Sequence, residues 1–474
     1  MAQVPLPLPK ESIIGRHGQD ANVRIINGYV ETFGQDNEGK SLYAIYAAAG
    51  LRRFDSGTIS SAERGMAVLD ESNFLTVLGL SVYNVTSAGV VSRLGGILGT
   101  GRVTMARNLN GTPQVGIVTE SGIYYLVQGG VVTHPSEVNL PAPNSICYVK
   151  GHFVYGISDG RIFASPMDAG TGINALSFDY ANSESDSLVR VFASVGYVYV
   201  FGTRSLEIWQ ATGDVPFPFG PVQQNIALGL LAKHSVAETE KGLLWVDHKG
   251  IVRYGRDGGA QRVSSHSVER SIASLSAEDQ TNITGFTYIC QGHQYYVLDA
   301  PTWTWVYDVD TNRWYERQTY GDSHWMASNT IWFNNKYIVS SNVNGNIFEI
   351  DPDYYFDSGA GFVLEVWCRD IHNFPGGVLV DFLDIDILSG VGLTSGDPSS
   401  QNPRLMIDYS DDGGKTFQGE RRVPIGKVGE WRQMIRTGHW GRIAQKGRIW
   451  RFRAPADVFR GILQASMKVR TCNG

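Results

Sequence analysis

The chain has 474 residues, a formal net charge of −6 and 42% hydrophobic residues, which excludes wholesale disorder and is enough to bury a large core. Only 18% of its residues are charged, against about 25% in an average soluble domain, and its 55 glycines exceed the usual share of about 7%. That balance suits a protein with many tight turns and much surface covered by partners. Aromatic residues make up 11% of the chain and favour strands, so we expect an all-β protein.

The N-terminal segment, residues 1–60, is predicted to form an arm followed by platform strands. Pro5, Pro7 and Pro9 alternate along it and favour an extended polyproline-II arm that lies on a neighbouring molecule. A charged region followed by an apolar one is missing from this segment, and the sequence contains no apolar run near 18 residues. We therefore expect synthesis in the cytoplasm and no insertion into a membrane.

Residues 61–355 repeat one theme, a short apolar strand, a turn and a second aromatic-rich strand. Seven such units begin near residues 73, 114, 146, 189, 242, 285 and 325. This spacing, with no helical periodicity between the units, is typical of four-stranded propeller blades. The turn dipeptides Ser121-Gly122 and Asp159-Gly160 fall where hairpins need them. The pattern predicts a β-propeller of about seven blades, with six or eight possible and a pair of β-sandwiches as the alternative.

The sequence pattern changes near residue 360. Residues 356–474 are therefore predicted to form a separate, basic C-terminal β-domain that serves as an interaction platform. Within it, "YSDDGGKTF" (409–417) has the pattern of an Asp-box, a hairpin turn that recurs in sialidases. Asp412 is expected to accept backbone N–H bonds, Gly414 to take a positive φ, and Phe417 to pack over the hairpin. The full pattern comprises Ser410, Asp412, Gly414, Thr416 and Phe417. A single copy outside the repeats favours a structural turn over a catalytic marker.

Positive charge is concentrated near the C-terminus. Residues 421–470 contain thirteen Lys or Arg and two acids, a local charge of +11, which leaves −17 for the remainder. Such asymmetry suggests contact with nucleic acid or with an acidic protein surface. The alternative is a solvated face balanced by Glu365, Asp381, Asp384 and Asp386. The candidate residues that face DNA or a partner are Arg421, Arg422, Arg432, Arg436, Arg442, Lys446, Arg448, Arg451 and Arg453.

The sequence nominates no catalytic residue, no cofactor-binding residue and no metal ligand. It contains no nucleophile elbow, zinc-protease helix motif, phosphate-binding loop or dinucleotide fingerprint. Two other classes remain as alternatives. One is a propeller glycosidase or depolymerase that acts on surface polysaccharide. The other is a carbohydrate- or receptor-binding module that uses Trp303, Trp305 and Trp314, although packing within a hairpin also explains these rings.

One stretch of the sequence indicates a protein family more specifically than the composition does. Residues 175–269 resemble the packaged-DNA stabilization, or tail-nozzle, proteins of short-tailed bacteriophages. The resemblance covers about residues 22–270, and the order of repeats continues it to about 350. Where that family commonly has Pro-Gly-Leu, this chain has Ala49-Gly50-Leu51. The residues that carry the resemblance include Phe178, Glu184, Glu207, Trp209, Gly213, Asp214, Phe219 and, near the N-terminus, Asn27, Gly28, Tyr29, Val30 and Glu31.

The resemblance implies a non-enzymatic structural protein of the virion tail that is assembled in the host cytoplasm. Copies would form a six-fold ring below the adaptor of the portal, close the DNA exit channel and stabilise packaged double-stranded DNA. The ring would also carry tailspikes or fibres and a needle or plug. The motif residues themselves are expected to have structural roles, because large rings such as Trp209 and Phe219 fit the core of a blade. In such a ring we expect most of the C-terminal arginines to face the adaptor or a neighbouring subunit, with a few at the DNA.

Overall fold

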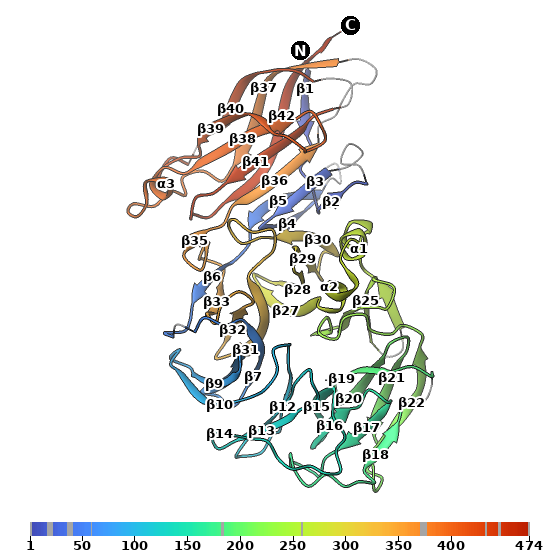
Figure 1. Ribbon diagram of the computed structural model, residues 1–474. Coiled ribbons are helices and arrows are strands. Elements are labelled where there is room, and N and C mark those ends of the chain that lie inside the picture. The colour runs from blue at the N-terminus through green and yellow to red at the C-terminus, as the bar shows by residue number, and fades with distance from the viewer. Residues whose placement is uncertain are drawn as a thin grey trace.

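The computed structural model describes residues 2–16, 22–35, 41–57, 59–181, 184–256, 259–369, 377–431, 434–443 and 447–472. Nearly all of its regular structure is β, in two bodies stacked on each other, a propeller below and a sandwich above (Figure 1). The expected all-β fold, a propeller with an additional β-domain, is confirmed.

The first five blades are separate four-stranded antiparallel sheets. Blade 1 contains β7 (Glu63–Val68), β8 (Asn73–Leu78), β9 (Ser81–Thr86) and β10 (Val91–Gly96). Blade 2 contains β11 (Thr104–Arg107), β12 (Gln114–Val118), β13 (Tyr124–Gln128) and β14 (Val131–Thr133). Blade 3 contains β15 (Ser145–Val149), β16 (His152–Gly156), β17 (Arg161–Ala164) and β18 (Phe178–Tyr180). Blade 4 contains β19 (Leu188–Ser194), β20 (Tyr197–Gly202), β21 (Leu206–Ala211) and β22 (Phe219–Ile226). Blade 5 contains β23 (Ala237–Thr239), β24 (Gly242–Val246), β25 (Val252–Arg256) and β26 (Gly259–Arg262).

The last two blades share their sheets with other parts of the chain. Blade 6 contains β27 (Thr284–Cys290), β28 (His293–Ala300), β29 (Trp303–Asp308) and β30 (Arg313–Arg317). Blade 7 contains β31 (Ala327–Phe333), β32 (Lys336–Ser341) and β33 (Ile347–Asp351), and its fourth strand is β6 (Gly50–Arg53), which precedes blade 1 in the sequence. The short strands β34 (Phe356–Asp357) and β35 (Ala360–Gly361) extend this sheet beyond β6. Because β31 also contacts β7 of blade 1, the seven blades close into a ring.

Most pairs of adjacent blades enclose their own hydrophobic layer, whereas blades 6 and 7 share theirs with the sandwich. Val77 of blade 1 packs with Ile117 of blade 2, and Phe74 of blade 1 packs with Phe333 and Ile338 of blade 7. The middle strands are therefore covered on both faces, which explains why they are nearly continuous apolar runs instead of alternating ones. Two short helices, α1 (His266–Ala273) and α2 (Ala277–Thr281), cross from blade 5 to blade 6.

The upper body is a β-sandwich assembled from both ends of the described chain. In Figure 1 its blue strands lie among orange and red ones. One sheet contains β1 (Ala2–Leu6), β4 (Gly28–Gln35), β5 (Ser41–Ala47), β37 (Gly377–Ile387), β40 (Ile435–Ile443) and β42 (Gly461–Cys472). The other contains β2 (Ile13–Ile14), β3 (Asn22–Ile26), β36 (Leu364–Arg369), β38 (Arg404–Ser410), β39 (Gln418–Pro424) and β41 (Ile449–Ala454), and α3 (Pro398–Gln401) lies in the loop before β38.

The N-terminal prolines do not form a polyproline-II arm that reaches away from the molecule. Residues Ala2–Leu6 form β1, which pairs antiparallel with β42, and Leu6 and Leu8 are buried in the sandwich core. Among the described strands, β1 pairs only with β42, and an edge strand tolerates Pro5 because one row of its N–H groups faces away from the ladder.

The two bodies share one sheet and one core. β30 of blade 6 runs beside β3 of the sandwich, so ten strands form one continuous sheet. Beneath it, Val297 and Tyr315 of blade 6 belong to the same hydrophobic cluster as Val366 and Leu383 of the sandwich. This junction fixes how the basic C-terminal strands lie relative to the propeller.

Candidate functional site

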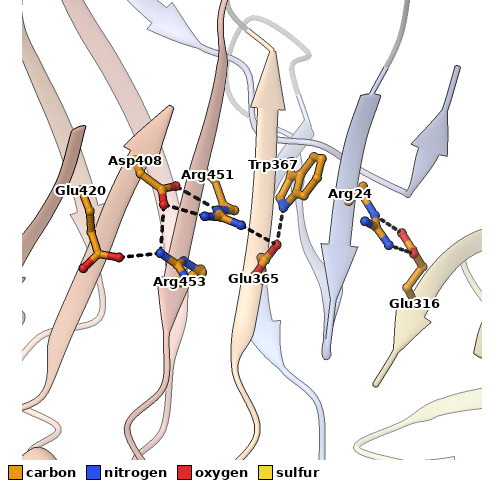
Figure 2. Close-up of polar contacts among 8 residues, drawn as sticks. All are labelled: Arg24, Glu316, Glu365, Trp367, Asp408, Glu420, Arg451 and Arg453. Carbon is orange, nitrogen blue, oxygen red and sulfur yellow. Dashed lines mark hydrogen bonds and ion pairs between the residues drawn. The ribbon is translucent and has the colours of Figure 1, made fainter. Parts of the chain in front are cut away.

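The candidate site is the charged surface of the ten-stranded sheet, where arginines and carboxylates from six neighbouring strands lie in one row (Figure 2). Arg453 on β41 bonds Glu420 on β39 at 2.7 Å and Asp408 on β38 at 2.9 Å. Arg451, two positions away on the same face of β41, holds both oxygens of Asp408 at 2.9 and 2.6 Å and lies 3.9 Å from Glu365 on β36. We call this row the charged ladder.

The charged ladder extends toward the propeller. On β36, the Trp367 indole donates to Glu365. The Arg24 guanidinium on β3 lies 5.0 Å from the Trp367 ring and forms a two-pronged contact with Glu316 on β30 of blade 6. A carboxylate of the propeller is thereby linked to the sandwich through paired charges (Figure 2).

Other predicted cations of the sandwich are also paired. Arg436 holds Asp384 at 2.7 and 2.9 Å, and Arg422 bonds Glu420 at 2.8 Å. Arg421 donates to the carbonyls of Gly438 and His439 and lies 3.9 Å from the centre of the Trp440 ring. Arg470 belongs to the same basic stretch. It bonds Asp381 and lowers the pKa of that carboxyl.

Arg448 is the most deeply placed of the predicted cations, with 3% of its surface exposed. It holds Asp411 at 2.7 and 2.9 Å, donates to the Trp440 carbonyl at 2.8 Å and stacks 3.6 Å from the centre of the Tyr409 ring. Because so little of its side chain reaches the surface, Arg448 stabilises the interior of the sandwich.

Arg442 differs from these residues. It is exposed, lies beside Gly377, and has no carboxylate partner within the part of the chain that the structure describes. The predicted site residues Arg432 and Lys446 lie outside the described residues. The stretch that counts as +11 in sequence is thus partly neutralised within the fold, by acids that include Glu365, Asp381 and Asp384.

The hairpin that follows β38 is held by Asp412. One carboxylate oxygen accepts the backbone N–H groups of Lys415 and Thr416 at 2.9 and 3.0 Å, and the other accepts the Thr416 hydroxyl at 2.6 Å. These bonds lower the pKa of Asp412, the Thr416 hydroxyl most of all. Ser410 accepts the Gly414 N–H at 2.8 Å, and Gly414 has a φ of 91°. The carboxylate is thus occupied by the turn itself.

Phe417 anchors the same hairpin to the charged ladder. Its ring meets Trp367 edge-on with centroids 4.8 Å apart, and the Arg451 guanidinium lies 3.7 Å from the ring centre. The Asp-box residues therefore pack against the sheet, and the turn buttresses the pairing of Arg451.

Most of the family-motif residues lie in blade 4. The Trp209 indole donates to the Glu207 carboxylate at 2.9 Å, and both side chains are buried. Phe219 is buried beside Trp209 in the layer between blades 3 and 4. Gly213 has a φ of 77°, and the exposed Asp214 follows it in the turn before β22. Glu184 is exposed ahead of β19.

The tryptophans of the receptor-binding alternative are mostly internal. Trp305 and Trp314 are each 1% exposed, and their indoles donate to the Ser271 hydroxyl and the Val263 carbonyl at 3.1 and 2.7 Å. Trp303 is half-buried. These contacts give two of the three rings a structural role in the layer between blades 5 and 6.

Sequence reasoning missed an apolar surface of the sandwich. Trp431 and Met434 are 68% and 66% exposed, and they flank a groove of 990 Å³ that Phe459 and Asp386 also line. A lone Trp after a glycine-rich turn gives no periodic signal, so only the folded surface reveals it. Large exposed apolar side chains beside a groove are typical of protein contacts.

Among the described residues, no group of three or more His, Cys, Asp or Glu is arranged to hold a metal ion. None of the helices in the described ranges is long and apolar enough to cross a membrane.

Several solved structures show a distant likeness to this chain. A computationally designed protein, Ika8, is 12% identical, with a TM-score of 0.38, 74% of this chain and 100% of that chain covered. BBS1N in complex with ARL6DN is 12% identical, with a TM-score of 0.40 and coverage of 65% and 97%. The extracellular domain of the putative hybrid two-component system BT4673 from B. thetaiotaomicron is 9% identical, with a TM-score of 0.43 and coverage of 63% and 39%. Scores this low support no argument.

Comparison with curated proteins gives no match. Two family models match in sequence order: the bacteriophage P22 Gp10 β-propeller over residues 35–355 and the bacteriophage P22 Gp10 β-sandwich over residues 371–470. These ranges cover most of the chain and fall on the two bodies that the structure contains. The chain therefore belongs to the bacteriophage P22 Gp10 family of phage stabilising proteins.

Proposed function

We propose that this protein forms the tail nozzle of a short-tailed phage, as a six-fold ring below the adaptor of the portal. The ring closes the DNA exit channel, stabilises the packaged double-stranded DNA and carries spikes or fibres and a needle or plug. The observation that carries the proposal is the ordered match of both P22 Gp10 family models to the propeller and the sandwich. Its work is structural and not enzymatic.

The charges of the sandwich favour protein contacts over DNA contacts. DNA attracts proteins through cations that can exchange their counterions for phosphates. Arg448 and Arg451 already hold carboxylates of their own chain. Arg442 is exposed without such a partner among the described residues, and Trp431 and Met434 offer apolar surface. We therefore assign the sandwich surface around the groove to the adaptor or to a neighbouring subunit, with few residues at the DNA.

The test is the mass and shape of the purified chain, alone and with its adaptor ring, by light scattering and negative-stain imaging. Six-fold rings that form alone or on the adaptor are the expected outcome. A chain that stays monomeric or trimeric and ignores the adaptor contradicts the nozzle role.

A second measurement separates protein contacts from DNA contacts. Ring assembly should weaken as salt rises, whereas a duplex fragment should show little binding to the isolated chain. Trp431→Ala should weaken assembly, and Val215→Ala, at an apolar residue of blade 4 that is also exposed, is the control and should not. Tight duplex binding with salt-independent assembly would reverse the assignment.

A further inference from the structure

The centre of the propeller contains a polar cavity of 240 Å³. Residues on β7, β11, β19, β23, β27 and β31, or just ahead of them, line it, so it lies on the propeller axis. At about 30 Å³ per water molecule, this volume holds a small ion together with several waters. Neither the charged ladder nor the groove on the sandwich includes any of its residues.

Arg190 on β19 is the central cation of this cavity. Its Nη1 donates to the Lys233 carbonyl at 2.8 Å, and the guanidinium lies 5.1 Å from the centre of the Phe192 ring. Its Nε is buried without a hydrogen-bond partner among the described residues. Burial lowers the pKa of Arg190 to about 10, which still leaves the side chain charged at neutral pH. Arg190 is half-buried, and a charge that is partly removed from water is stabilised by a counterion.

The neighbours of Arg190 add positive charge. Burial, and then Arg190, lower the pKa of Lys233 to about 8. Burial and the charges of Arg190, Arg102 and Lys233 lower the pKa of His234, which therefore stays neutral. Within the described part of the chain, no carboxylate is among the charges that shift the pKa of Arg190 or His234.

The acids nearby are already committed. Glu63 lies 3.7 Å from Arg102 and accepts the Ser328 hydroxyl at 3.1 Å. Glu238 lines the cavity, but its carboxylate accepts the Ser194 hydroxyl at 2.6 Å and the residue is exposed. Neither of these acids pairs with Arg190, so its guanidinium can accept an additional negative group as a partner.

We propose that the axial cavity of the propeller binds a small free oxyanion, with inorganic phosphate as its simplest example, held by the Arg190 guanidinium beside Arg102. A planar guanidinium with a free Nε matches the spacing of two oxyanion oxygens. The inference is independent of the nozzle role, since it rests on the inner wall of one propeller.

The test is thermal unfolding of the full chain at constant ionic strength, with chloride replaced stepwise by phosphate. A ligand that binds only the folded state raises the midpoint in proportion to the logarithm of its concentration once that exceeds the Kd. Phosphate and sulfate should do so, whereas chloride, which has no oxygen atoms, should not. Duplex DNA at the same phosphate concentration should have no effect, which separates a free oxyanion from a nucleic-acid backbone.

Arg190→Gln should weaken phosphate binding about ten- to hundredfold, because the charge-assisted bonds are lost. Arg161→Gln is the matched control. Arg161 is paired with Asp159 on blade 3, outside the cavity, and its loss should leave the phosphate effect intact. An equal midpoint rise in wild type and Arg190→Gln overturns the proposal.

One further measurement covers the case in which Arg190→Gln fails to fold. Broadening of the phosphorus NMR signal of inorganic phosphate reports binding to the wild type directly. A signal that the protein leaves unbroadened overturns the proposal, whatever the variants do.

Discussion

Arg448 joins three parts of the sandwich through one side chain, since it holds Asp411 after β38, the Trp440 carbonyl on β40 and the face of Tyr409. Lysine has a single ammonium group and cannot reproduce this planar fork. We expect Arg448→Lys to lower the free energy of unfolding by about 3 kcal/mol, as for a broken buried ion pair. Urea unfolding followed by tryptophan fluorescence measures this change.

Arg422→Lys is the control for Arg448→Lys. Arg422 has an exposed side chain that bonds Glu420, and exposed ion pairs contribute about 0–1 kcal/mol. A comparable loss of stability in both variants would mean that the two contacts are equally important, contrary to their burial.

His293 on blade 6 lies between two carboxylates, with Nδ1 2.8 Å from Asp308 and Nε2 3.2 Å from Glu31 of the sandwich. The hydrogen bond to Asp308 is the largest cause that raises the pKa of His293 to about 9. A pKa raised above its unfolded value of about 6.5 gives stability that is fully present below pH 6.5 and is lost as the pH rises through 9. Allowing for screening by solvent, we expect about 2 kcal/mol.

The measurement for His293 is the urea midpoint between pH 6 and pH 10, for the wild type and for His293→Gln. The difference between the two proteins should shrink as the pH rises, because only the wild type loses a charged pair. A constant difference would show that the imidazole does not titrate between pH 6 and pH 10.

At this scale, the sequence predicts contacts that span a few residues. Asp412 bonds groups within four positions, so the pattern Ser-x-Asp-x-Gly-x-Thr is enough to infer its role. Arg453 instead bonds Asp408 and Glu420, which lie on other strands. A count of charges along the sequence treats such a residue as unpaired, because the residues next to it in sequence do not show which strands it will lie beside.

At the scale of elements, the closing strand β6 depends on Gly50. A Cβ on this residue would lie 2.2 Å from the Tyr354 carbonyl oxygen and 2.7 Å from that of Phe356, so the backbone would have to move. We expect Gly50→Ala to destabilise the protein by about 1–3 kcal/mol, the typical cost of overpacking, and to speed proteolysis near blade 7. Gly111→Ala is the matched control, because nothing lies within 4 Å of its added Cβ. Equal stability of the two variants would contradict this account of β6.

The blades can be predicted from the sequence because each consists of apolar strands that follow one another along the chain and are joined by short turns. Asp247, for example, accepts the N–H groups of Lys249 and Ile251 and so closes its own hairpin. The pairing partners of β1 and β6 cannot be predicted in this way. β1 pairs with β42 and β6 pairs with β33, and each partner is some hundreds of residues away in the sequence. Nothing in a short apolar strand specifies which distant edge it joins. The helices α1 and α2 were missed because they are too short to show a helical period.

At the scale of the whole molecule, the continuous sheet and the shared core predict a single unfolding transition. Separating the bodies would expose Val297, Tyr315 and Val366 together and would break the contact of Arg24 with Glu316. Scanning calorimetry should give one peak whose calorimetric and van't Hoff enthalpies agree. Two resolved peaks would show that the propeller and the sandwich unfold independently.

The interleaving of β1–β5 with β36–β42 also affects the order in which the two bodies can fold during synthesis. The first strands leave the ribosome long before their partners exist, and at about 5–20 residues per second the propeller between them takes roughly tens of seconds to synthesise. During that interval the apolar faces of β4 and β5 have no sheet to join. The order of synthesis therefore makes the sandwich the last body to form, and makes the nascent chain a client for chaperones until β42 arrives.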